Sequence, residues 1–179
     1  MGTKKRPYIV HQRRGQGQQR VHGHARGPKV GETESGLDPA KLSAKPAELR
    51  RQLLAWTRSG GLAGPVEGDS AQLWAAASDV LFHPGGPVSP QVRAACYRVL
   101  ADLPDVRSLG EVADARGRRG QGLTRAGAEG VGPGQYKLII DLRGGLPLAE
   151  EMPGGPDGRP STYFLVTGTG YTATAPGAN

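Results

Sequence analysis

Three of the four histidines gather near the N-terminus. His22 and His24 are two residues apart, which places both side chains on one face of an extended strand. A hairpin centred on Gln16-Gly17 would set His11 opposite His22, and three imidazoles on one patch could bind Zn²⁺ or Cu²⁺. However, no Asp or Glu lies nearby in the sequence to orient the rings, and a solvated polar hairpin explains the same residues. We therefore predict no metal and no cofactor.

Other residue types that could perform catalysis do not form a motif. Glu150 and Glu151 are adjacent, so on a strand they point to opposite faces and cannot act as an acid–base pair. Cys96 lies on the apolar stripe of a predicted helix, where a thiol is buried and unreactive. The segment "GTGYTA", residues 168–173, follows a predicted strand, but Pro176 prevents the helix that a phosphate-binding loop requires. We predict that the protein is not an enzyme.

Positive charge is concentrated in the N-terminal fifth of the chain. Residues 1–36 hold eight Lys and Arg against two Glu, whereas residues 37–179 have a net charge of only +1. These basic groups could contact the phosphates of nucleic acid or of an anionic lipid surface. They include Lys4, Lys5, Arg6, Arg13, Arg14 and Arg20. Tyr8 is the one aromatic residue among them and no DNA-reading motif follows, so a solvated basic tail is the simpler interpretation.

Three amphipathic helices are predicted between about residues 46 and 103 from hydrophobic spacing. Prolines, glycines and capping residues mark their ends. The helices begin at Pro46, at Asp69 or Ser70, and at Ser89-Pro90, and they end before Gly60-Gly61, at Pro84 and before Pro104. Their apolar stripes are Leu49, Leu53 and Trp56, then Leu73, Ala77, Val80 and Leu81, and finally Val92, Ala95, Cys96, Val99 and Leu103.

From Val106 to about residue 174 the pattern changes to strands and turns. "VRSLGEVAD" and "RRGQGLTRA" flank a turn in which Gly117 can adopt a positive φ. "QYKLIIDL" and "LPLAEEM" form a second hairpin, in which Tyr136, Leu138, Ile140 and Leu142 alternate with Lys137, Ile139 and Asp141, so that one face is buried. "STYFLVTGTGYTAT" supplies a last strand.

Helices followed by strands predict an α+β fold. We expect an antiparallel, curved β-meander of about five strands, similar to a half-barrel, packed on about three α-helices. The domain would span residues 37–179, preceded by a basic segment, residues 1–36, whose hairpin could extend the sheet. The predicted core residues are Val92, Cys96, Val99, Leu103, Tyr136, Leu138 and Ile140.

Three stretches resemble the C-terminal region of a family of uncharacterised actinobacterial proteins: "VRAACYRVLADLPDV", "VADARGRRGQGL" and "KLIIDLRGGLPLAEE". The family pattern is an Arg-Ala-Ala-x-Tyr-Arg-x-Leu-Ala helix with a Leu-Pro-x-Val exit, an Asp-x-x-Gly-Arg-x-Gly hairpin and an Asp-x-x-Thr-Gly hairpin. These map to residues 93–101, 103–106, 114–120 and 141–145. The resemblance covers about residues 46–168. It implies a lipoprotein-carrier-like half-barrel that follows a single membrane helix on the extracytoplasmic side, in proteins associated with sigma-factor regulation.

The chain departs from this pattern in three ways. Cys96 replaces a larger aliphatic residue, and Arg143-Gly144 replaces the Thr-Gly pair. No stretch approaches the roughly 18–20 apolar residues of a membrane span, and the first residues match neither a signal peptide nor a myristoylation site. We therefore expect no export signal or anchor in the sequence as written. The resemblance points to an N-terminally truncated family member, and the localisation stays open.

These observations predict a non-enzymatic ligand-sensing or protein-interaction domain of an actinobacterial membrane-associated protein, with a regulatory role. Its partner would be an envelope or regulatory protein, or an apolar small molecule lined by Trp56, Trp74 and Phe82. An anionic lipid surface is a further partner suggested by the basic segment. Two alternatives stay open: a small basic protein that binds nucleic acid through residues 4–26, and a truncated protein without independent function.

Overall fold

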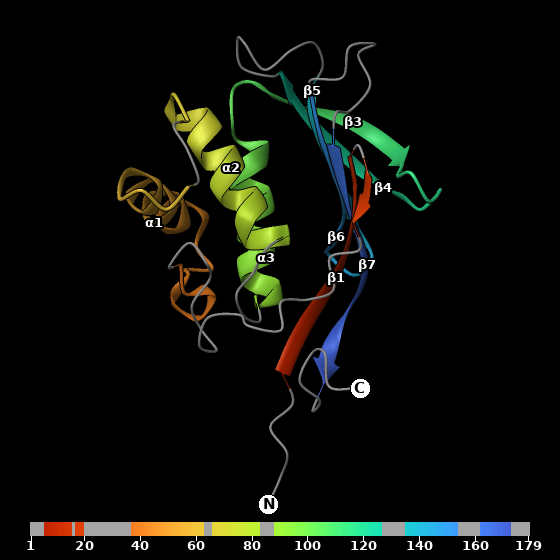
Figure 1. The fold of residues 1–179 in the computed structure, drawn as a ribbon. Coiled ribbons are helices and arrows are strands. Elements are labelled where there is room, and N and C mark those ends of the chain that lie inside the picture. Colours follow the sequence, from red (N-terminus) through yellow and green to blue (C-terminus); the bar gives the residue numbers. More distant parts are fainter. Residues whose placement is uncertain are drawn as a thin grey trace, which may run out of the picture. The chain divides into compact units, whose positions relative to one another are not determined.

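The computed structural model describes residues 6–15, 17–19, 37–62, 66–82, 88–126, 135–153 and 162–172. Within these ranges three α-helices and an antiparallel sheet of seven strands confirm the predicted α+β class (Figure 1). The chain divides into two compact units. The helical unit holds the three helices and the turn Leu142–Leu146, and the sheet unit holds most of the strands.

The helices of the helical unit begin where the sequence predicts. A short 3-10 helix, η1 (Pro39–Lys41), precedes α1 (Pro46–Arg58), α2 (Asp69–Phe82) and α3 (Pro90–Ala101). Ser89 caps α3, because its Oγ accepts a hydrogen bond from the backbone N of Val92 at 3.2 Å. Proline occupies a first-turn position in both α1 and α3, where its missing N–H removes no helical hydrogen bond.

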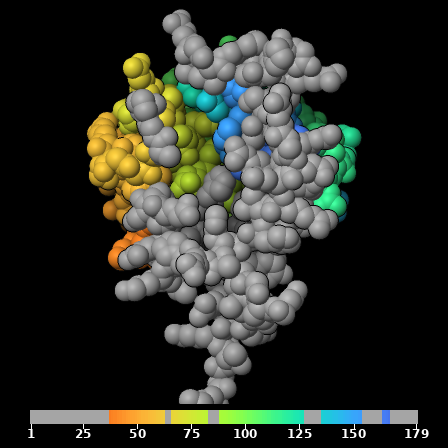
Figure 2. Space-filling model, viewed as in Figure 1, coloured from red at the N-terminus to blue at the C-terminus, as the bar shows by residue number. Residues whose placement is uncertain are grey.

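The core of the helical unit is made of the predicted stripes. All three helices contact one another, and the apolar stripes of α1 and α3 are buried as expected. The opposite, polar side of α1 reaches the surface, where it forms part of the orange-to-yellow patch in Figure 2. Helix α2 is different, because it is buried on nearly every side and only half-buried along Gln72, Ala75 and Asp79. An apolar surface around the whole circumference is typical of a central helix.

The sheet is open, with strand order β2-β1-β7-β6-β5-β4-β3. The five-stranded meander predicted from the sequence is β3 (Val106–Ala113), β4 (Arg119–Ala126), β5 (Gln135–Asp141), β6 (Leu146–Met152) and β7 (Thr162–Thr172). The N-terminal hairpin, β1 (Arg6–Gly15) and β2 (Gly17–Gln19), extends it along β7. This part of the basic segment therefore pairs with the sheet, as the expected hairpin allowed.

The side chains of β5 do not alternate between buried and exposed as we expected. Leu138 and the adjacent Ile139 are 1% and 0% exposed, so the middle of β5 is buried on both faces of the sheet and not on one. Ile139 forms an apolar cluster with Ala149 of β6 and Leu165 of β7. Tyr136, which we expected in the core, is only half-buried because it lies near the strand end. Leu142, which we placed on the buried face, lies beyond the strand in the turn and is exposed.

Within the described ranges no helix is long and apolar enough to cross a bilayer. The most apolar helix, α2, has 14 residues. At 1.5 Å per residue such a helix spans about 21 Å, short of the roughly 30 Å of a hydrocarbon core.

Candidate interaction site at the β5–β6 turn

The turn between β5 and β6 presents an apolar side chain to solvent. Its residues are Leu142, Arg143, Gly144 and Gly145, and Gly145 has a φ of +61°, a conformation that disfavours residues with a side chain. Leu142 is 73% exposed, against 41% for Leu109, the other large apolar side chain exposed in the described part of the chain. A single exposed leucine is common on protein surfaces and does not by itself mark a contact site, so the geometry of the turn that carries Leu142 has to be considered as well.

Helix α3 holds this turn through two side chains. Arg93 and Tyr97 are one helical turn apart, so both lie on the same side of α3. The Nε of Arg93 and the hydroxyl of Tyr97 each donate a hydrogen bond to the carbonyl oxygen of Gly145, both at 3.1 Å. The Nη1 of Arg93 also donates to the carbonyl oxygen of Val88 at 2.8 Å. We call these contacts the Arg93–Tyr97 brace. They fix the turn against α3 within the helical unit.

The brace joins two stretches of the chain that are far apart in the sequence. Arg93 and Tyr97 belong to the helix motif, and Gly145 ends the hairpin motif 48 residues beyond Tyr97. Because the acceptor is a backbone carbonyl, the contact does not depend on the side chains at positions 143 and 144. Hydrogen bonds from a charged donor are worth roughly 1.5–3 kcal/mol, so the brace can hold the turn in one conformation.

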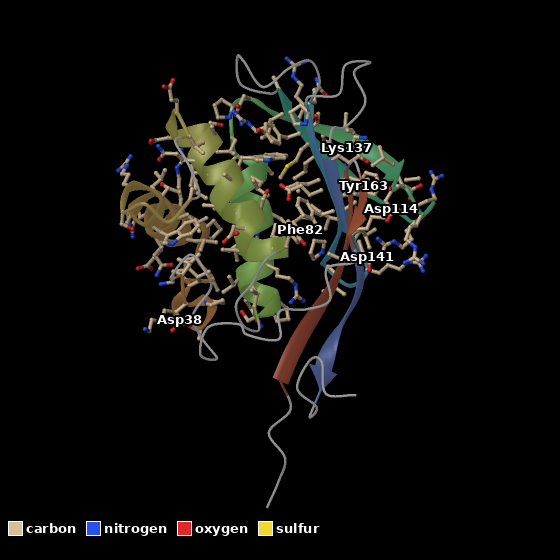
Figure 3. All side chains as sticks on the ribbon, viewed as in Figure 1. Asp38, Phe82, Asp114, Lys137, Asp141 and Tyr163 are labelled. Atoms are coloured by element: carbon tan, nitrogen blue, oxygen red, sulfur yellow. The ribbon has the colours of Figure 1, made fainter. Side chains whose placement is uncertain are left out.

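A second brace, between Asp114 and Arg118, shapes the β3–β4 turn in the sheet unit (Asp114 is labelled in Figure 3). Asp114 Oδ1 accepts hydrogen bonds from the backbone N of Arg116 at 2.8 Å and of Arg118 at 2.9 Å. Its Oδ2 accepts from the Nε of Arg118 at 2.6 Å. Gly117 has the predicted positive φ, +77°. The Asp-x-x-Gly-Arg part of the hairpin motif is therefore a structural device, which we call the Asp114–Arg118 brace.

The guanidinium of Arg118 also joins two strands of the sheet. The backbone pairing of β6 with β7 runs from Met152–Thr162 to Ala149–Leu165. The next residues along the two strands are Leu148 and Val166, and their carbonyl oxygens accept from Arg118 Nη2 at 2.9 Å and Nη1 at 2.6 Å. Arg118 thus donates hydrogen bonds to backbone carbonyls just beyond the last paired residues of β6 and β7.

Polar side chains from β4, β5, β6 and β7 follow one another across the sheet. Lys137 of β5 forms an ion pair with Glu151 of β6, with 2.6 Å between Nζ and Oε2. Thr124 is the register partner of Lys137, and Tyr163 is the register partner of Glu151 (Lys137 and Tyr163 are labelled in Figure 3). The adjacent Glu150 lies on the opposite face of β6, as the strand geometry requires, and is buried. The two carboxylates therefore do not converge, and Glu151 neutralises Lys137.

The predicted metal and anion sites fall largely outside the described residues. The residues of these sites that lie outside the described ranges are His22, His24, Lys4, Lys5 and Arg20. Those that lie on β1 are His11, Arg6, Arg13 and Arg14. The pairing of Gly15 with Gly17 differs by one residue from the register that would set His11 opposite His22. Among the described residues no group of three His, Cys, Asp or Glu side chains is placed to hold a metal ion.

The residues predicted to line an apolar ligand site are all buried side chains of the helical unit. Trp56 of α1 is 8% exposed, and Trp74 and Phe82 of α2 are 2% and 1% exposed. The indole of Trp56 lies against Gly61, where an added Cβ would come within 2.1 Å of the ring. Trp74 and Phe82 instead share one side of α2. Cys96 is fully buried on α3 as predicted, and burial raises the pKa of its thiol to about 12.

The sequence pattern did not identify Arg93, Tyr97 or Leu142 as site residues. The sequence did offer one indication for Leu142. Gly144 and Gly145, two and three residues later, mark a turn and so place the leucine outside the strand. Comparison of the chain with models of protein families, with curated proteins and with solved structures found no match.

Proposed function

We propose that this chain is a non-enzymatic protein-interaction domain with a regulatory role, and that the β5–β6 turn is its contact point. The observation that supports the proposal is Leu142, which is 73% exposed on a turn held by two side-chain hydrogen bonds. The family resemblance supports placing the domain in an actinobacterial membrane-associated protein, with an envelope or regulatory protein as partner.

The chemistry of the turn indicates what such a partner must offer. Burying a leucine side chain stabilises a complex by about 1.5–3 kcal/mol, so the partner needs an apolar pocket. Asp141 and Arg143 flank Leu142 directly and their charges offset, so a polar rim around that pocket without a strong charge of either sign would be favoured. Because the brace already fixes the turn, little conformational entropy is lost when the partner binds.

The test is capture of a partner from an extract of the native host by the immobilised full chain. Leu142→Asp removes the exposed apolar group, and Leu109→Asp is the matched control, because Leu109 is the other large apolar residue that is exposed among the described residues. We expect a protein that the wild type and Leu109→Asp retain equally and that Leu142→Asp retains at least tenfold less. Equal retention by all three chains would show that the turn is not the contact point.

A second variant tests the brace itself. Arg93→Met leaves Leu142 in place but removes the charged donor to Gly145. We expect it to weaken capture by loosening the turn while the helices stay folded, as judged by circular dichroism. If Arg93→Met captures the partner as well as the wild type, the brace has no role in presenting Leu142.

A further inference from the structure

We propose that the two-stranded ribbon formed by Arg6–Val10 of β1 and Gly168–Thr172 of β7 binds the anionic lipid headgroups of a membrane surface. We call it the β1–β7 ribbon (red and blue in Figure 1). Its partner is a lipid surface and not a protein, so the proposal goes beyond the function proposed above. The ribbon belongs to the sheet unit and the β5–β6 turn to the helical unit, so the two proposals can fail separately.

The ribbon has only two strands because β7 continues beyond its pairing with β6. Among the described residues, β6 pairs with β7 over Thr162–Leu165, whereas β1 pairs with β7 to its end. Just past the last β6 pair, Arg118 binds the carbonyl oxygens of Leu148 and Val166. The five paired positions beyond this point extend about 17 Å. A two-stranded ribbon by itself is marginally stable in water, so a surface that packs against it stabilises it.

The strands around the ribbon carry positive charge and no negative charge. The described residues of β1, β2 and β7 include Arg6, Arg13 and Arg14 but no Asp or Glu. Lys4 and Lys5 precede Arg6 in the sequence. Clustered basic residues are attracted to the negative surface potential of anionic lipids, and each one adds to the binding. The charge of the ribbon therefore complements an anionic membrane surface.

Tyrosine and aliphatic residues occur on both faces of the ribbon. The register and the alternation along each strand divide the residues between these faces. One face holds Arg6, Tyr8, Val10, Gly168, Gly170 and Thr172, and the other holds Pro7, Ile9, Thr169 and Tyr171. Tyrosine is enriched at membrane–water interfaces, because its ring is apolar and its hydroxyl stays wet. At the level of the headgroups, water can also satisfy the backbone groups of an open strand edge, which the hydrocarbon core cannot do.

Nucleic acid is a less suitable partner for the ribbon. The major groove of DNA admits a two-stranded ribbon, but reading the bases there relies mainly on Arg, Lys, Asn and Gln side chains. Arg6 is the one residue of these types among the paired positions of the ribbon. Contacts with phosphates would use the positive charge but not the tyrosine, isoleucine and valine residues.

The test is cosedimentation of the full chain with lipid vesicles. Vesicles of phosphatidylcholine alone are compared with vesicles of phosphatidylcholine and phosphatidylglycerol in equal parts. The ribbon charge variant replaces three basic residues by glutamine: Lys4→Gln, Lys5→Gln and Arg6→Gln. A ribbon tyrosine variant carries Tyr8→Ser and Tyr171→Ser.

The matched control removes the same number of charges elsewhere. It carries Arg107→Gln, Arg116→Gln and Arg119→Gln, three exposed arginines of β3, β4 and the turn between them. Leu142→Asp is a second control, because it removes the contact point of the other proposal and leaves the ribbon unchanged. Circular dichroism establishes that each chain is folded before its binding is compared.

We expect the wild type to bind the anionic vesicles and not those of phosphatidylcholine alone. Binding should weaken at least about tenfold between about 0.05 M and about 0.5 M salt, because salt screens exposed charges. The ribbon charge variant should bind at least about tenfold more weakly than the wild type, and the tyrosine variant about fivefold more weakly. Both controls should bind within about twofold of the wild type.

Absence of binding to the anionic vesicles, or equal losses in the two charge variants, would overturn the proposal. Tyrosine substitutions that leave binding unchanged would also overturn it, because the ribbon would then not enter the interface. If the tyrosine variant does not fold, the comparison of the two charge variants still decides. Binding to a DNA duplex with none to the vesicles would assign the ribbon to nucleic acid and reject the lipid surface.

Discussion

Replacing Arg118 by methionine should destabilise the sheet unit strongly. The substitution keeps much of the side-chain volume but removes three side-chain hydrogen bonds, to Asp114, Leu148 and Val166. It also leaves the Asp114 carboxylate, whose side chain is 0% exposed, with two backbone donors only. Breaking a buried ion pair on one side costs about 3–5 kcal/mol. Because Arg118 itself is 33% exposed, water can compensate in part, and we expect a loss of about 2–4 kcal/mol.

The adjacent residue provides the matched control. Arg119 pairs with Glu111, but their side chains are 67% and 63% exposed, and surface pairs of this kind contribute less than about 1 kcal/mol. In a chain of this size each kcal/mol shifts the thermal midpoint by about 2–4 °C. Arg118→Met should therefore lower the midpoint by roughly 4–16 °C, and Arg119→Met by less than about 4 °C. Thermal and urea unfolding followed by circular dichroism measure both. Equal losses in the two variants would refute the role of the brace.

Further predictions concern Cys96, Gly61 and Ser89. Ellman's reagent should react with Cys96 at least 100-fold more slowly in the folded protein than in urea. Burial raises the pKa of this thiol from 9.0 to about 12. The folded state therefore favours the protonated thiol. Its contribution to stability is fully present below pH 9 and is lost progressively as the pH rises towards 12. The urea midpoint of the wild type should accordingly fall more steeply above pH 9 than that of Cys96→Ala. Gly61→Ala should lower the urea midpoint by the equivalent of about 1–3 kcal/mol, because its Cβ would meet the Trp56 indole. Ser89→Ala should lower it by about 1 kcal/mol through the lost helix cap, and a change below 0.3 kcal/mol would contradict the capping contact.

The local elements of the fold could be predicted because their signals are local. Pro46, Ser89 and Pro90 act within one helical turn of their own position, and each marks a helix start in the structure. Gly117 likewise adopts the positive φ that its turn requires. The order from β3 to β7 followed from the sequence, since consecutive strands tend to be neighbours in an antiparallel sheet. The position of β1 beside β7 did not, because these strands lie at opposite ends of the chain.

The contacts that define the candidate site could not be predicted from spacing. Arg93 and the Gly145 carbonyl are 52 residues apart, and Arg118 and the Val166 carbonyl are 48 apart. In both pairs the acceptor is a backbone oxygen, which leaves no trace in the identity of the residue that carries it. The burial of β5 also escaped the alternation rule, because that rule identifies an apolar face and does not reveal whether the other face is covered as well.

The most direct test of the braced turn as a contact point is photo-crosslinking in cells of the native host. A benzophenone amino acid is placed at position 142 in one full-length chain and at position 109 in another. The proposal predicts one specific protein adduct from position 142 that is absent from position 109 and weaker when Arg93→Met is added. No protein adduct from position 142, or the same adducts from both positions, would contradict it.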